Sequence, residues 1–176
     1  MRGSAHELVE VFDQLELLGE LHPVEASVRL KTGALTGLAF SGGAVLGGLS
    51  ESDLDTAFQI GEEIGVILQF LDDLRNLKPD ALAPGKQFED LQNQRPGLVW
   101  KIAAEHASAS CWSDLIQAVE RLPARAPVEQ WLIKYAVVGA AMSQVHERMN
   151  RLKGRLNRPN EITDILQQLV NAYEKL

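Results

Sequence analysis

The sequence lacks most features that place a protein outside the cell or in a membrane. Cys111 is the single cysteine among 176 residues, so an intrachain disulfide is impossible and a reducing compartment is favoured. No apolar run reaches the roughly 18 residues that a membrane-spanning helix needs, and no signal-peptide pattern opens the chain. We therefore expect a cytoplasmic protein without a membrane span.

Positive charge is also scarce. The chain has 17 lysines and arginines against 24 aspartates and glutamates, for a net charge of −7. No segment concentrates enough basic residues to neutralise a nucleic-acid backbone, which excludes a sequence-independent nucleic-acid binder. The four histidines, at positions 6, 22, 106 and 146, show no metal-ligand spacing.

No segment shows the sustained two-residue alternation of a strand, so we predict an all-α fold. Hydrophobic periodicity, caps, glycines and prolines predict helices over residues 4–18, 23–48, 52–76, 97–106, 113–122 and 127–154, with a last helix from residue 160. Glu62 and Glu63 are interpreted as favourable charge near a helix N-terminus. With no repeat or linker, residues 1–176 are expected to form a single helical domain.

One helix carries an unusual polar stripe. Gln69, Asp72, Asp73 and Asn76 recur at i, i+3, i+4 and i+7, which places them on one face of an otherwise apolar helix. Carboxylates are rarely buried unless they are paired or bind a metal ion. For the aspartate pair alone, a solvated helix face is the simpler interpretation.

Two further segments favour a functional site over a solvated helix face. The loop after the polar stripe contains Lys86, Asp90 and Arg95, which bring cations and another acid near the end of the same helix. The preceding helix carries Lys31 and Thr32 at the start of a stretch dense in glycine, a residue that costs about 1 kcal/mol relative to alanine inside a helix. Such a helix either packs closely against a neighbour, with an exposed lysine, or bends around a cavity.

These three segments together resemble the C-terminal half of the trans-isoprenyl diphosphate synthases, the polyprenyl synthetase family. The motifs are KTGAL at residues 31–35, GVILQFLDDLRN at 65–76 and GKQFEDLQNQRPG at 85–97, in the family's order and spacing. The resemblance implies the second half of an isoprenoid-synthase helical bundle. It also implies Mg²⁺-dependent condensation of an allylic diphosphate with isopentenyl diphosphate.

By this resemblance, each motif has a role. Asp72 is the expected Mg²⁺ ligand, with Asp73 supporting it and Asp90 ordering its water shell. Lys31, Lys86 and Arg95 are expected to hold the diphosphate. Thr32 and Gln69 are expected to point neutral dipoles toward the developing carbocation, so that Lys31, Thr32 and Gln69 form the catalytic group.

The sequence departs from the family pattern in ways that matter. Asn76 stands where an aspartate is usual, and Arg95 and Gly97 replace a lysine and a threonine. The family's first aspartate-rich motif belongs to an N-terminal half that has no counterpart in these 176 residues. We therefore expect one subunit of a split synthase, inactive alone, with a second chain supplying that motif. There are two alternatives. The chain is a degenerate regulatory or structural partner of an active synthase, or it is half of a class I terpene cyclase.

Burial gives a separate reason to expect a partner. Both helices are apolar nearly all round. The glycine-rich helix has Leu35, Leu38 and Leu46, and the aspartate helix has Ile64 and Leu68. Monomers rarely expose apolar patches beyond a few hundred Å². We expect another chain to cover this surface, a distinct subunit in preference to a second copy.

Overall fold

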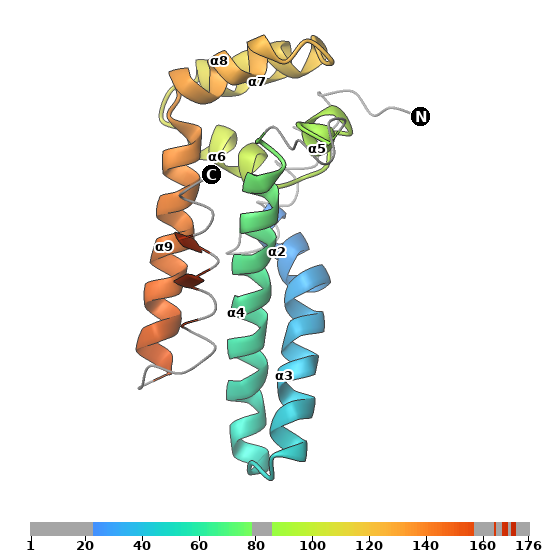
Figure 1. Cartoon of the computed structure of the whole chain (residues 1–176), viewed down its shortest axis with the longest axis vertical. Coiled ribbons are helices and arrows are strands. Elements are labelled where there is room, and N and C mark those ends of the chain that lie inside the picture. Colours follow the sequence, from blue (N-terminus) through green and yellow to red (C-terminus); the bar gives the residue numbers. More distant parts are fainter. Residues whose placement is uncertain (1–22, 79–85, 157–163, 165–166, 169, 172–176) are drawn as a thin grey trace. The chain divides into compact units, whose positions relative to one another are not determined.

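The computed structural model describes residues 23–78, 86–156, 164, 167, 168, 170 and 171, and these contain helices and no strand (Figure 1). The all-α prediction is therefore confirmed for the described part of the chain. The expected helices over 4–18 and from 160, and the proline-rich loop at 79–85, lie outside the described residues. None of the described helices is both long and apolar enough to cross a membrane.

The described chain divides into two compact units. The hairpin unit comprises Ser27–Arg75 together with the chain from Met142 onward, and the loop unit comprises residues up to Ala26 together with Asn76–Ala141. Each unit is described by itself. The polar stripe begins in the hairpin unit and ends at Asn76, the first residue of the loop unit's longer segment.

The hairpin unit is built on two helices that lie side by side, α3 (Ala34–Leu46) and α4 (Glu51–Arg75) (Figure 1). Gly48, at a φ of 75°, adopts the left-handed conformation that the tight turn between them requires. Glycines then allow close packing along the hairpin. A Cβ on Gly61 would lie 2.6 Å from the Thr36 carbonyl oxygen, and one on Gly65 would lie 2.8 Å from that of Thr32.

The helix expected over 23–48 is present with one irregularity. It consists of α2 (Pro23–Val28), a π-helical turn at Arg29–Gly33 and α3. Thr36 Oγ1 donates a hydrogen bond of 2.7 Å to the Thr32 carbonyl, so that the side chain binds an oxygen within the widened turn. Single π-turns inside α-helices occur frequently at functional sites. Lys31 and Thr32 both lie in this turn.

The loop unit contains the short helices α5 (Glu89–Gln92), α6 (Leu98–Glu105), α7 (Ser110–Glu120) and α8 (Ala126–Lys134). Its core contains Trp100, Phe88 and Leu115, which are almost fully buried. Cys111 is buried as well, and its carbonyl accepts a hydrogen bond of 2.9 Å from the Trp131 indole. Cys111 is therefore a core residue.

The prediction of a single long helix over 127–154 is wrong. Helix α8 ends at Lys134, and α9 begins afresh at Val137 and continues to Arg155. Ala136 between them has a φ of 49°, which an α-helix does not accommodate. The Tyr135 hydroxyl donates to Asp114 on α7 at 2.6 Å, an anchor that holds the chain at this break.

Candidate active site

The centre of the candidate site is a relay of three side chains in the hairpin unit. Thr32, in the π-turn, donates a hydrogen bond of 2.9 Å from its Oγ1 to Gln69 Oε1 on α4. Gln69 Nε2 donates in turn to Asp73 Oδ1, one helical turn further along α4, also at 2.9 Å. The structure thus brings together three of the residues predicted from the sequence, and each fixes the orientation of the next.

The two aspartates have different surroundings. Asp73 is half-buried and engaged with Gln69, whereas Asp72 is exposed and forms no hydrogen bond or ion pair with the described residues. Lys31 is likewise exposed beside Thr32. A carboxylate and an ammonium group that are both open to solvent remain available to a ligand.

A buried ion cluster anchors the π-turn from the other side. Arg29 donates to Glu62 Oε2 at 2.7 Å and to Glu63 Oε2 at 2.9 Å. The second oxygen of Glu63 accepts a bond of 2.8 Å from Arg148 on α9, and Arg148 lies over the Phe70 ring. The cluster therefore ties the turn that carries Lys31 and Thr32 to two other helices.

Sequence reasoning missed this cluster. Glu62 and Glu63 were expected near a helix N-terminus, but α4 begins at Glu51 and both lie in its middle. That interpretation is wrong, because Glu62 lies about three turns after the first residue of the helix. An acidic pair within an apolar stretch, with an arginine on the neighbouring helix, was the signal that could have indicated it.

In the loop unit, Asn76 organises the start of the loop. Its carbonyl accepts the Phe88 N–H at 2.9 Å, and its side-chain Oδ1 accepts the Asp90 N–H at 3.3 Å. Arg95 Nη1 donates to Asp90 Oδ1 at 3.0 Å, which makes an ion pair of two predicted site residues. Lys86 is exposed. Asn76 thus holds the loop through hydrogen bonds that require no charge.

The predicted site residues fall into two groups. Lys31, Thr32, Gln69, Asp72 and Asp73 belong to the hairpin unit, whereas Lys86, Asp90 and Arg95 belong to the loop unit. The structure joins Thr32, Gln69 and Asp73 by hydrogen bonds in the first group and Asp90 and Arg95 by an ion pair in the second. Across residues 23–78 and 86–156, no three acidic, histidine or cysteine side chains gather closely enough to hold a metal ion by themselves.

The donor set still fits Mg²⁺ as one wall of a site. Mg²⁺ is commonly held by one or two carboxylates together with substrate phosphates and several waters, rather than by an all-protein cage. Asp72 offers such a carboxylate, unpaired among the described residues and open to solvent. One oxygen of the predicted ligand Asp73 accepts the hydrogen bond from Gln69.

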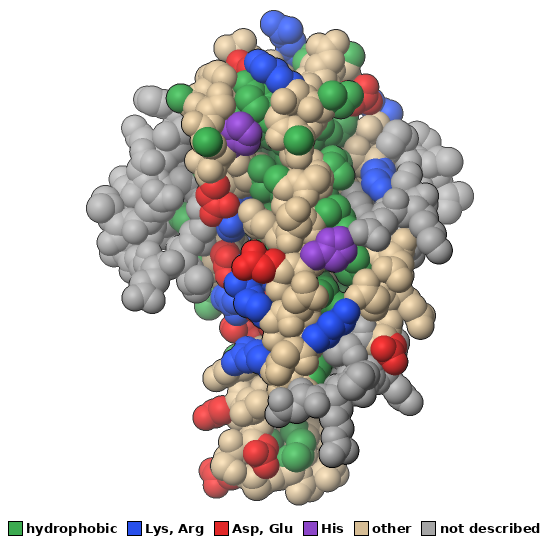
Figure 2. Space-filling view, turned by 90° about the vertical axis from the view of Figure 1, so that its left-hand side faces the viewer, with side chains coloured by type: hydrophobic (Ala, Val, Ile, Leu, Met, Phe, Trp, Pro, Cys, Tyr) green, Lys and Arg blue, Asp and Glu red, His purple; other side chains and the backbone are tan. Residues whose placement is uncertain are grey.

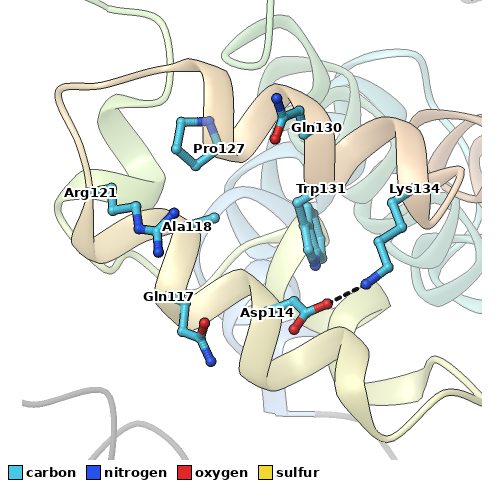
Figure 3. Close-up of a pocket in the computed structure, with 8 residues that line it drawn as sticks. All are labelled: Asp114, Gln117, Ala118, Arg121, Pro127, Gln130, Trp131 and Lys134. Atoms are coloured by element: carbon cyan, nitrogen blue, oxygen red, sulfur yellow. Dashed lines mark hydrogen bonds and ion pairs between the residues drawn. The ribbon is translucent and has the colours of Figure 1, made fainter.

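A groove in the loop unit lies apart from all of these residues. It has a volume of about 180 Å³ between α7 and α8, with Trp131 at its base and the Asp114–Lys134 ion pair at one end (Figure 3). Hydrogen bonds from Lys134 and Tyr135 lower the pKa of Asp114, and the bond to Asp114 raises the pKa of Lys134. None of the sequence-predicted site residues lines it.

Basic and acidic side chains lie close together on the described surface (Figure 2). Figure 2 shows Lys and Arg side chains beside Asp and Glu side chains over the middle of one face of the described structure. Oppositely charged pairs such as Arg151 and Glu147 on α9 neutralise each other locally. A phosphate-binding face needs cations that are not already neutralised by neighbouring acids.

Comparison with known proteins places the chain in a family. Searches of curated proteins and of solved structures found no match. The family model for polyprenyl synthetase matches residues 4–135, about three quarters of the 176 residues and including all three motifs. This family carries out prenyl transfer with diphosphate substrates in isoprenoid biosynthesis. The chain belongs to the polyprenyl synthetase family.

Proposed function

We propose that this chain is one subunit of a split isoprenyl diphosphate synthase. The assembled enzyme transfers the prenyl group of an allylic diphosphate to isopentenyl diphosphate, with Mg²⁺ as cofactor. The observation that carries the proposal is the Thr32–Gln69–Asp73 relay, with Lys31 and Asp72 exposed beside it.

The chemistry assigns a task to each side chain. Ionisation of an allylic diphosphate releases a polyanion while a carbocation forms, and bound Mg²⁺ neutralises the leaving charge. Lys31 and Lys86 supply point charges for the diphosphate, and Arg95 supplies a fork of donors once it is released from Asp90. The Arg95–Asp90 pair is exposed, so its opening costs little.

The relay also protects the carbocation. Thr32 and Gln69 present neutral oxygens, which stabilise a nearby cation without the full charge that could capture it. Because Gln69 Nε2 is bound to Asp73, its carbonyl oxygen is held toward Thr32. A rotation of the amide would bring its oxygen against the Asp73 carboxylate, two acceptors, so the relay fixes the orientation of Gln69.

The need for a second chain rests on the sequence and on exposed apolar surface. The single aspartate pair of the 176 residues, Asp72 and Asp73, belongs to the second motif, so we infer that the first half of the metal clamp comes from elsewhere. Leu35, Leu38 and Leu46 are all strongly exposed on α3. These features support assembly with a chain that carries the first aspartate-rich motif.

The test is reconstitution. The purified chain alone should not condense allylic and isopentenyl diphosphates, and activity should appear on mixing with the second subunit and Mg²⁺. Asp72→Ala should abolish that activity and leave helicity unchanged, whereas Asp55→Ala, another exposed aspartate of α4, should leave it intact. Robust turnover by the chain alone, or by the Asp72→Ala complex, contradicts the proposal.

A second candidate is a degenerate subunit that regulates or supports an active synthase. The specific observation in its favour is Asn76, whose amide holds the loop where the family usually has an aspartate. In that case Asp72→Ala leaves the turnover of the complex unchanged. A class I terpene cyclase complex is distinguished by its cyclic hydrocarbon product from an allylic diphosphate alone.

A further inference from the structure

The groove between α7 and α8 is built from two matching rows of side chains. One row follows α7 to its C-cap at i, i+3, i+4 and i+7, and the other repeats that spacing along α8: Asp114, Gln117, Ala118 and Arg121, then Pro127, Gln130, Trp131 and Lys134. Residues at this spacing share one face of a helix, so each helix turns one face toward the groove. The 2.7 Å ion pair of Asp114 with Lys134 joins the start of one row to the end of the other. The groove therefore has Lys134 at one end and Arg121 at the opposite end (Figure 3).

The two ends of the groove differ in how their charges are satisfied. Lys134 Nζ and the Tyr135 hydroxyl both donate to Asp114 Oδ2, at 2.7 and 2.6 Å. These bonds lower the pKa of Asp114, so its carboxylate neutralises Lys134 at neutral pH. Arg121 is exposed and forms no hydrogen bond or ion pair through its side chain with the described residues. The groove thus carries one positive charge in excess, at the Arg121 end.

A single free guanidinium selects a ligand with one negative charge. Its donors form a planar fork that matches the two oxygens of a carboxylate. A phosphate group also fits this fork but carries close to two negative charges at neutral pH. The second charge would have no free counterion in the groove, and it would face the carboxylate of Asp114. Charge complementarity therefore favours a monocarboxylate.

The middle of the groove offers hydrogen bonds of both kinds. Gln117 on α7 and Gln130 on α8 are exposed, and neither side chain forms a hydrogen bond with the described residues. Each amide has two N–H donors and one acceptor oxygen. A peptide group supplies a donor and an acceptor in return, whereas a hydrocarbon chain supplies neither. The buried Trp131 and Ala118 form an apolar base that suits a small apolar side chain.

The size of the groove fits the end of a chain. Its volume of about 180 Å³ is below the roughly 300–1,000 Å³ of sites that enclose a drug-sized ligand or a cofactor. Seven residues of helix separate Arg121 from Asp114, a rise of about 10 Å, which roughly three residues of extended peptide span. Asp114 Oδ1 accepts no bond from the described residues and can accept a peptide N–H at that distance.

We propose that the groove between α7 and α8 binds the C-terminal end of an extended peptide chain. The terminal carboxylate lies on Arg121, the peptide groups lie between Gln117 and Gln130, and an upstream N–H donates to Asp114. This inference goes beyond the proposed function, because none of the residues assigned to prenyl transfer lines the groove. It gives the chain a means of holding another protein by its C-terminus.

Titration of the full isotope-labelled chain, followed by NMR, tests recognition of the carboxylate. The two probes are N-acetyl-trialanine with a free carboxylate and the same peptide with a C-terminal carboxamide. The acid should shift the side-chain signals of Arg121, Gln117 and Gln130, with a dissociation constant on the order of 0.1–1 mM. The carboxamide should bind at least about tenfold more weakly, because it lacks the charge that the guanidinium holds. Acetate that binds as tightly as the peptide acid would mean an adventitious ion only, and would overturn the proposal.

Matched substitutions locate the site. Arg121→Gln should weaken binding of the peptide acid on the order of tenfold or more, and should remove the difference between acid and carboxamide. Arg125→Gln makes the same change of charge at an exposed arginine that does not line the groove, and it should leave binding unchanged. Gln130→Leu should weaken both peptides to a similar extent, because it removes bonds to the peptide groups. Circular dichroism checks that each variant keeps its helices.

Three results refute the peptide site. They are equal binding of acid and carboxamide, equal losses in Arg121→Gln and Arg125→Gln, and no saturable shift at about ten times the expected dissociation constant. None of these titrations contains Mg²⁺, a diphosphate or the second subunit. Failure here therefore leaves the reconstitution test of prenyl transfer independent.

Discussion

Glu63 is the most deeply buried acid of the hairpin unit, and its replacement by glutamine tests how firmly the π-turn is held. The Glu63 and Arg148 side chains are only 10% and 6% exposed, and their atoms Oε1 and Nη1 lie 2.8 Å apart. The other carboxylate oxygen binds Arg29, so a single negative charge is shared between two guanidinium groups. Glutamine keeps the size of the side chain and removes that charge.

The expected cost follows from the asymmetry of buried ion pairs. Loss of one partner of such a pair typically destabilises a protein by about 3–5 kcal/mol, because the remaining charge stays desolvated. We expect about 3 kcal/mol for Glu63→Gln, at the lower end, since Arg29 is partly exposed and pairs with Glu62 as well. Glu147→Gln on α9 removes an acid whose pair with Arg151 is 57–67% exposed, and it should cost less than about 0.5 kcal/mol.

Urea unfolding followed by circular dichroism measures both variants, at one protein concentration so that self-association contributes equally. Arg148→Met combined with Glu63→Gln should cost less than the sum of the two single changes, because the buried charges are removed together. Equal free energies of unfolding for Glu63→Gln and Glu147→Gln would refute the view that the cluster anchors the turn.

Three further outcomes are expected. Gly65→Ala should lower the free energy of unfolding by about 1–3 kcal/mol, because the new Cβ overlaps the Thr36 hydroxyl. Gly43→Ala, where the new Cβ lies in open space, should raise the free energy of unfolding by up to about 1 kcal/mol. Equal free energies of the two variants in urea unfolding would contradict the close packing at Gly65. The hydrogen bond from Lys134 lowers the pKa of Asp114, so its stabilising contribution is present above the ordinary aspartate pKa and is lost as the pH falls through the lowered value. An NMR titration midpoint of this carboxyl at or above that of a free aspartate would contradict the bond. Asn76→Asp should leave the fold intact and tighten Mg²⁺ binding by the assembled enzyme in a calorimetric titration, and weaker binding would argue against a metal at this wall.

The sequence predicted well those features that depend on hydrophobic periodicity and on helix caps, glycines and prolines. Helix α4 was expected from residue 52 and begins at Glu51, and Gln69 and Asp73 lie on one face of it and bond to each other as the spacing indicated. The relay to Thr32 was not predictable from spacing, because it depends on the local width of the π-turn. That width is set by tertiary contacts, including the pairing of Arg29 with Glu62 and Glu63.

The break between α8 and α9 escaped prediction for a similar reason. No proline or glycine interrupts the segment from Trp131 to Val138, so local propensity favours a continuous helix. The helix stops because Tyr135 is bonded to Ser110 and Asp114, partners more than twenty residues away along the chain. Such a contact is visible only once the fold is known.

The glycines of α3 connect the fold to the proposed function. On one face Gly33 and Gly37 lie against α4, where Gly61 and Gly65 leave room for the opposing backbone. Only at this close approach does the Thr32 hydroxyl reach Gln69 at 2.9 Å, because threonine has one of the shortest polar side chains. On the other face Gly42 opens a gap in a row of leucines. A Cβ at Gly33 would lie 3.0 Å from Glu62 and one at Gly37 would lie 2.9 Å from Phe58, which explains why the sequence retains at these two positions residues that weaken the helix in isolation.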